Sequence, residues 1–107
     1  HRLFLTEASL AGKLIHPHIV EIYDAVADED NAYIVMEYVP GGTLQRFTRA
    51  DNLLALGDVI EVVYKCARAL DFASQLGVIH RDIKPANIMV KDNTDIKVMD
   101  FGSAALL

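Results

Sequence analysis

The stretch from His80 to Gly102 reads HRDIKPANIMVKDNTDIKVMDFG. It contains two short segments in which apolar and polar residues alternate, 87–91 and 95–100, separated by the turn residues 92–94. Alternation on both sides of a polar turn predicts a β-hairpin. Pairing of the two strands would place the loop before the first strand beside the residues that follow the second.

Four polar side chains gather where this hairpin begins and ends: Asp82, Lys84 and Asn87 in the loop, and Asp100 after the second strand. Oxygen ligands of this kind suit Mg²⁺, which needs few protein carboxylates when substrate phosphates supply the rest. An ammonium group neutralises charge on a transferred group, and a free carboxylate can orient an attacking hydroxyl. The four residues together predict a metal–phosphate site better than they fit simple turn or capping roles.

A long helix is predicted before the loop, over residues 58–76. Asp58 is expected to cap its N-terminus with Glu61 as partner in a capping box, and Gly77 suits a left-handed C-terminal cap. The residues expected on its buried face are Val59, Val63, Cys66, Ala67, Leu70 and Ala73. This is the longest element that the sequence predicts.

The remaining elements lie upstream of this helix. They are a helix over 2–15 that ends before Pro17, strands over 19–26 and 32–39, and a short helix over 44–47 with Thr43 as its N-cap. A polar turn at residues 28–31 joins the two strands. Helices and strands that follow one another in this segregated order indicate the α+β class.

The composition is that of an ordinary globular chain of 107 residues, with 52% hydrophobic residues, 23% charged residues and 3 prolines. The net charge of −5 gives no reason to expect a nucleic-acid partner, because such binding needs clustered Lys and Arg. The single Cys66 cannot form an internal disulfide, which fits a reducing cytoplasm. No apolar run approaches the ~20 residues that cross a bilayer, so we expect no membrane segment in this chain.

Two parts of the sequence carry a family resemblance. The segment HRDIKPAN at 80–87 resembles the catalytic loop of protein kinases, and DFG at 100–102 resembles their magnesium-binding triplet. The pair Lys84-Pro85 resembles the serine/threonine class, and residues 79–89 look most similar to bacterial, eukaryotic-like kinases. The whole chain can be laid on the family pattern.

This resemblance implies a bilobal kinase fold, of which the chain would supply a part. Residues 1–36 would form the end of the N-lobe, 37–42 the hinge, and 43–107 the first part of the C-lobe. The family's glycine-rich loop and phosphate-holding lysine would precede His1, and the chain has no initiating Met. We therefore expect flanking parts of the same kinase domain in a longer protein, and little activity from these residues alone. We expect that protein in the cytoplasm, or anchored to a membrane with its kinase on the cytoplasmic side.

The resemblance also implies catalytic roles. Asp82 would accept the proton of a substrate hydroxyl, and Lys84 would contact the γ-phosphate of ATP. Asn87 belongs to the same loop and, with Asp100, would hold Mg²⁺. The implied reaction is ATP-dependent phosphorylation of Ser or Thr hydroxyls in a protein substrate.

A nucleotide site is implied near the predicted hinge, because residues 33–39 resemble the strand that leads into it. Met36 would be the gatekeeper residue at the back of the adenine site. The Glu37 carbonyl and the Val39 amide would bind the adenine edge, and Met89 would line the site from below. Core filling is the alternative role for both methionines.

Glu7 is a further candidate in the nucleotide site. It lies among the apolar residues of the first predicted helix, where a lone carboxylate would be costly to bury, so it needs a cationic partner. The resemblance implies that this partner is an upstream lysine that holds the α- and β-phosphates of ATP. An exposed position of Glu7 is the alternative.

Two other functions stay open. A small-molecule phosphotransferase of the aminoglycoside or choline type shares His-x-Asp and an Asn five residues after the Asp, although Lys84 favours a protein kinase. A catalytically silent scaffold or nucleotide-binding fragment is the alternative outside the enzymes. The four polar residues of the predicted site are intact, which argues against a degenerate pseudokinase but not against an inert fragment; they are Asp82, Lys84, Asn87 and Asp100.

Overall fold

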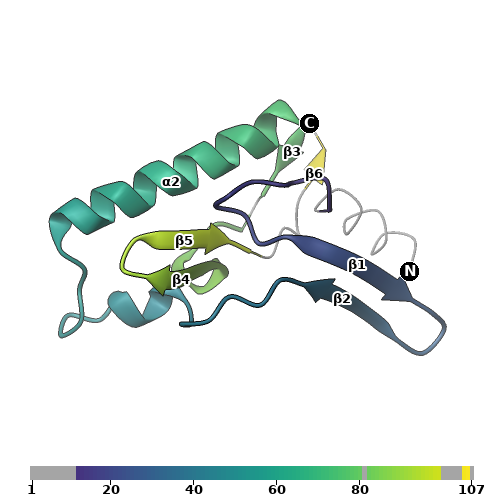
Figure 1. Cartoon of the computed structure of the whole chain (residues 1–107), viewed down its shortest axis with the longest axis horizontal. Coiled ribbons are helices and arrows are strands. Elements are labelled where there is room, and N and C mark those ends of the chain that lie inside the picture. Colours follow the sequence, from purple (N-terminus) through teal and green to yellow (C-terminus); the bar gives the residue numbers. More distant parts are fainter. Residues whose placement is uncertain (1–11, 81, 100–104, 107) are drawn as a thin grey trace.

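The computed structural model describes residues 12–80, 82–99 and 105–106 of the chain (Figure 1). The elements in chain order are β1 (Ile22–Ala27), β2 (Ala32–Met36), η1 (Leu44–Phe47), α2 (Leu56–Gln75), β3 (Val78–Ile79), η2 (Pro85–Asn87), β4 (Ile88–Asp92), β5 (Asp95–Val98) and β6 (Ala105–Leu106). Within the described part, the strands pair as β1–β2, β3–β6 and β4–β5. Figure 1 shows α2 along one side of the β4–β5 hairpin, with the β1–β2 ribbon projecting beyond it.

The predicted hairpin is confirmed as β4–β5 and lies at the centre of the core. Its antiparallel register pairs Ile88 with Val98, Met89 with Lys97, and Val90 with Ile96. The buried side chains of one face are Ile88, Val90, Ile96 and Val98. Met89 and Lys97 lie on the opposite face, because successive side chains of a strand alternate. The turn contains Asn93, whose φ of 28° is a left-handed value that asparagine tolerates.

The segment before β1 pairs with the hairpin rather than with the β1–β2 ribbon. Ile19 forms a parallel bridge with Val98. The N–H of Val20 donates to the Val98 carbonyl (2.9 Å), and the N–H of Val98 donates to the His18 carbonyl (2.8 Å). The single strand predicted here therefore divides, and β1 starts at Ile22.

The other strands are also shorter than predicted. β2 ends at Met36 rather than at residue 39, because the next ladder bond is made by a side chain: the N–H of Glu21 donates to Oε1 of Glu37 instead of to a backbone carbonyl. β4 starts one residue late, at Ile88, because the N–H of Asn87 donates to the Lys84 carbonyl (2.9 Å) and closes the η2 turn. β5 ends at Val98 rather than at residue 100.

The long helix is confirmed, but its start is not at the predicted residue. α2 begins at Leu56 with Ala55 in the N-cap position and no side-chain cap bond, so the capping box of Asp58 and Glu61 is wrong. Asp58 lies in the first turn, where a carboxylate favours the helix dipole. At the other end Gly77 has a φ of 82°, which confirms the predicted left-handed position.

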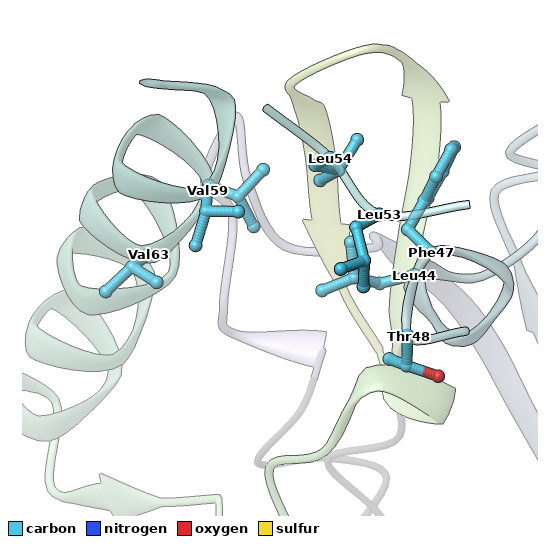
Figure 2. Close-up of a pocket in the computed structure, with 8 residues that line it drawn as sticks. Leu44, Phe47, Thr48, Leu53, Leu54, Val59 and Val63 are labelled. Atoms are coloured by element: carbon cyan, nitrogen blue, oxygen red, sulfur yellow. The ribbon is translucent and has the colours of Figure 1, made fainter. Parts of the chain in front are cut away.

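The buried face of α2 differs in part from the predicted one. Cys66 and Ala73 are buried as expected, and the other two buried residues are Val62 and Ala69. Val59 and Val63 are exposed, so their prediction as buried residues was wrong. Both line an apolar pocket of about 280 Å³ at the surface, which Figure 2 shows. The other residues that line it are Leu44, Phe47, Thr48, Leu53, Leu54 and Val62. Ala67 is exposed, and Leu70 is half-buried.

Two smaller predictions concern the other helices. The short helix at Leu44–Phe47 is confirmed as a 3₁₀ turn, but Thr43 in its N-cap position makes no side-chain cap bond. The helix predicted over 2–15 lies largely outside the described residues, and the chain has left helical geometry by Leu14. The pairing of β3 with β6 was not predicted, since two-residue strands give no periodic signal.

Within the described part of the chain, no helix is long and apolar enough to span a membrane.

Candidate active site

The loop between β3 and β4 is held in place by His80, whose ring is almost fully buried. The N–H of Asp82 donates to Nδ1 of His80 (3.0 Å), so Nδ1 is the acceptor nitrogen of this ring. The other nitrogen, Nε2, then donates to the Met99 carbonyl (2.8 Å). His80 therefore ties the start of the loop to the residue that follows β5.

Asn87 closes the loop at its other end. Its side chain is buried, and Nδ2 donates to the Asp82 carbonyl oxygen (2.9 Å) and to Asp82 Oδ2 (3.2 Å). Its own carbonyl accepts a hydrogen bond from the N–H of Met99 (2.9 Å). Because Nδ2 is used in this way, Oδ1 is the atom of Asn87 that can serve as a ligand to a hard cation.

Lys84 completes the cluster of predicted catalytic residues. Its Nζ lies 3.7 Å from Asp82 Oδ2, with the two side chains 55% and 42% exposed. An ion pair this open to water contributes little to stability. The structure therefore brings Asp82, Lys84 and Asn87 together as one cluster in which a carboxylate and an ammonium remain accessible to a ligand.

The predicted adenine residues line a separate pocket of about 320 Å³. Its lining residues are Val20, Met36, Glu37, Tyr38, Val39, Met89 and Met99. All four hinge and floor residues named from the sequence are thus in one place. Sequence reasoning missed the other three, although Met99 has a signal in its position directly before the DFG triplet and Tyr38 lies between two predicted residues.

Met99 connects the pocket with the catalytic cluster. Its side chain lines the pocket, while its backbone carbonyl and N–H are bound by His80 and Asn87. Met89 is held from the other side, since it forms a bridge with Thr43 and the N–H of the next residue, Val90, donates to the Gly42 carbonyl (2.9 Å). The loop, the hairpin and the predicted hinge segment, residues 37–42, are therefore one bonded unit.

Glu37 carries the main electrostatic feature of the pocket. Partial burial acts to raise the pKa of its carboxyl group, but hydrogen bonds from the Glu21 N–H and the Lys97 ammonium outweigh this and lower that pKa below its ordinary value. Glu37 is therefore ionised at neutral pH. The sequence predicted a role for the backbone carbonyl of Glu37 but none for its charged side chain.

Two predicted site residues, Glu7 and Asp100, lie outside the described residues. Among the residues that the structure describes, no group of three or more His, Cys, Asp or Glu side chains could hold a metal ion. The predicted magnesium ligands are of a different kind, an amide oxygen from Asn87 and the carboxylate of Asp100, which directly follows Met99.

Comparison with known proteins matches residues 1–107 to the protein kinase domain. A probable serine/threonine-protein kinase of Clostridium acetobutylicum is 46% identical over 94% of this chain and 15% of its own length. Serine/threonine-protein kinase PknB of Mycolicibacterium smegmatis is 47% identical over 97% of the chain and 17% of its own length. Serine/threonine-protein kinase PrkC of Bacillus subtilis is 42% identical over 99% of the chain and 16% of its own length.

The chain spans only 15% to 17% of the length of these relatives. The similarity nevertheless runs through nearly all of the chain, including the loop and hairpin described above. The α+β fold class and the resemblance seen in the sequence are thereby confirmed. The chain belongs to the protein kinase domain family.

Proposed function

We propose that the protein transfers the γ-phosphoryl group of ATP to Ser or Thr hydroxyls of proteins. The observation that carries this proposal is the bonded cluster of Asp82, Lys84 and Asn87, which Met99 joins to a pocket lined by the hinge. Relatives named serine/threonine-protein kinases support the substrate class. Their names also favour a protein substrate over the small-molecule alternative.

The pocket lined by Met36, Glu37, Val39 and Met89 would hold the adenine of ATP. Its floor and walls are largely apolar, as a flat heteroaromatic ring requires. Backbone groups of Glu37 and Val39 would supply the polar contacts at the ring edge. A phosphate chain leaving this pocket along Met99 would reach the catalytic cluster.

Mg²⁺ fits the donor atoms at the end of that path. Oδ1 of Asn87 is left for a ligand by the two bonds that Nδ2 makes, and Asp100 would add a carboxylate. When bound, the ion would neutralise charge on the ATP phosphates and favour their transfer. Lys84 would add a second positive charge beside the transferred group.

Asp82 would bind and orient the attacking hydroxyl. As the hydroxyl oxygen forms its bond to the γ-phosphorus, the bond from that phosphorus to the bridging oxygen of ADP breaks. The hydroxyl proton passes to the Asp82 carboxylate, which lies beside Lys84 and remains open to water. Cytoplasmic ATP would supply the reaction, and the free, buried thiol of Cys66 is compatible with that compartment.

The test uses the full gene product with γ-labelled ATP, Mg²⁺ and a generic protein substrate. We expect label on protein Ser and Thr, read by phosphoamino-acid analysis, and its loss when EDTA removes the metal. A choline or aminoglycoside acceptor tests the small-molecule alternative in parallel. Labelling of that acceptor alone, or ATP binding without any transfer, would contradict the proposal.

A further inference from the structure

The side chain of Glu37 extends the β1–β2 ribbon by one position. Glu37 directly follows β2, and its N–H donates to the Glu21 carbonyl (2.9 Å). In return, the N–H of Glu21 donates to Oε1 of Glu37 (2.9 Å). The carboxylate thus takes the place of a strand carbonyl at the end of the ladder, beyond the last pair of Ile22 and Met36.

The same carboxylate oxygen reaches the central hairpin. Nζ of Lys97 lies 3.1 Å from Glu37 Oε1, and the two residues are 60 positions apart in the sequence. Lys97 is the direct cross-strand partner of Met89, and such partners project from the same face of a sheet. The ion pair therefore lies beside the floor of the pocket, with the hinge on one side and the hairpin on the other.

This ion pair is partly shielded from water. The Lys97 and Glu37 side chains are 24% and 21% exposed, far less than Lys84 and Asp82 in the catalytic cluster. Removing one partner of a shielded pair leaves the other charge unpaired, which is costly. The Glu21 N–H, the Lys97 ammonium and the charge of Lys91 all keep Glu37 ionised.

We propose that the Glu37–Lys97 ion pair is a positioning device for the nucleotide. It holds the backbone of residues 37–39 against the Met89 floor, so that the groups that bind the adenine edge are correctly spaced before ATP arrives. Such preorganisation lowers the cost of binding. This inference rests on the proposed function, because it assigns the pocket to adenine.

The first test substitutes Lys97→Met in the full gene product. Loss of the ammonium removes the side-chain bond between Glu37 and the hairpin, while the bond between Gly42 and Val90 stays, so residues 37–39 lose their fixed position. We therefore expect KM for ATP and Kd for ADP to rise about five- to tenfold. We expect kcat to change less than about twofold, because the catalytic loop is bound through His80 and Asn87 instead. Lys97→Arg keeps the charge, so its KM for ATP and its Kd for ADP should be close to those of the wild type.

Lys91→Met is the matched control. Lys91 lies on β4, the other strand of the same hairpin, and it acts on Glu37 through its charge without a hydrogen bond. Lys91→Met makes the same chemical change as Lys97→Met, since both replace an ammonium-bearing side chain with an uncharged one. We expect KM for ATP within about twofold of the wild type, since no contact to the hinge is lost.

Glu37→Gln tests the other partner. The amide oxygen can still accept the Glu21 N–H, so the ribbon end stays bonded while the charge is lost. We expect the same rise in KM for ATP as in Lys97→Met. The double variant should have a KM for ATP no higher than that of the single variant with the higher KM, because the two substitutions remove the same interaction.

Three results would overturn the inference. The first is a KM for ATP in Lys97→Met equal to that in Lys91→Met. The second is a double variant in which the effects of Lys97→Met and Glu37→Gln on KM add fully. The third is a rise in kcat with KM unchanged. The last would mean that the pair restrains a movement instead of positioning the nucleotide. An inactive wild type that binds ADP would count against the proposed function alone, and the ADP Kd series would still decide the inference.

Discussion

Gly41 shows how tightly the hinge segment approaches the hairpin. Its φ of +109° lies in a region that side chains rarely adopt, and a Cβ placed there would overlap the Val90 carbonyl oxygen. Only glycine lets the backbone pass this close to β4 without strain. The residue therefore fixes the position of the hinge relative to the pocket floor.

Gly41→Ala should lower the free energy of unfolding by about 1–3 kcal/mol, because both the backbone angle and the contact with Val90 become strained. Denaturant titration of the full gene product measures this. Gly57→Ala is the control, since Gly57 is helical and a methyl group added to it would meet nothing within 4 Å. It should raise stability by about 0.5–1 kcal/mol. Equal stability of Gly41→Ala and the wild type would contradict the close approach.

Met36 is the residue whose size should set the depth of the pocket. It lines the pocket as the last residue of β2, so Met36→Gly should enlarge the space and admit ATP analogues with bulky N6 substituents. The ratio of kcat/KM for such an analogue to that for ATP should rise at least about tenfold. Val35→Gly is the matched control, because Val35 is equally exposed and lies on the opposite face of the strand. Equal ratios in the two variants would place Met36 outside the adenine site.

At the scale of elements, the segment before β1 packs on α2 through a histidine. The His16 ring lies 5.0 Å from the Phe72 ring of α2, and its Nδ1 accepts the His18 N–H (3.1 Å). Burial, followed by electrostatic repulsion from His18 and Arg68, lowers the pKa of His16. The folded protein therefore favours the neutral ring, which keeps the acceptor nitrogen free of a proton.

This packing predicts a pH dependence of stability. The unfolded chain binds a proton at His16 near the ordinary pKa of about 6.5, before the folded chain does, so unfolding becomes easier as the pH falls below that value. The loss is complete once the pH is below the folded pKa. His16→Asn keeps an acceptor and removes the titration, so its free energy of unfolding should fall less between pH 8 and pH 5. Identical slopes for the two proteins would exclude this role of His16.

The elements that the sequence predicted correctly are those set by neighbouring residues, and the features that it missed depend on contacts between distant ones. The β4–β5 hairpin, the left-handed Gly77 and the cluster of Asp82, Lys84 and Asn87 were predicted, because each depends on residues close in sequence. The pairing of Ile19 with Val98 was not, since periodicity cannot reveal partners so far apart. That pairing also accounts for the late start of β1, since the residues before Ile22 are bonded to β5.

The same limit applies to the site. Four pocket residues were named from the family pattern, but Val20 and Met99 line the pocket only because distant strands pair. The side chain of Glu37 was likewise assigned no role, since its partner Lys97 is 60 residues away. The buried face of α2 was misjudged in part, because Val59 and Val63 line an open apolar pocket and stay exposed.

On the scale of the whole molecule, three kinds of contact unite the described parts. Backbone pairing joins the segment before β1 to β5, the Glu37–Lys97 ion pair joins the predicted hinge to the hairpin, and Met99 joins the pocket to the predicted catalytic loop. A nucleotide bound at one end and a hydroxyl bound at the other would thereby meet in a fixed geometry. Phosphoryl transfer depends mainly on such positioning and on charge stabilisation.

The most direct measurement compares phosphoryl transfer and ADP binding in the wild type and Asp82→Asn. The substitution is nearly isosteric and leaves an oxygen that can accept from Asn87, so the loop should persist. Asp71→Asn, at an exposed position of α2, is the control for loss of one carboxylate. We expect Asp82→Asn to lower kcat about a hundredfold or more while Kd for ADP stays within about twofold. Unchanged kcat, or a large rise in KM for ATP with kcat intact, would contradict this expectation.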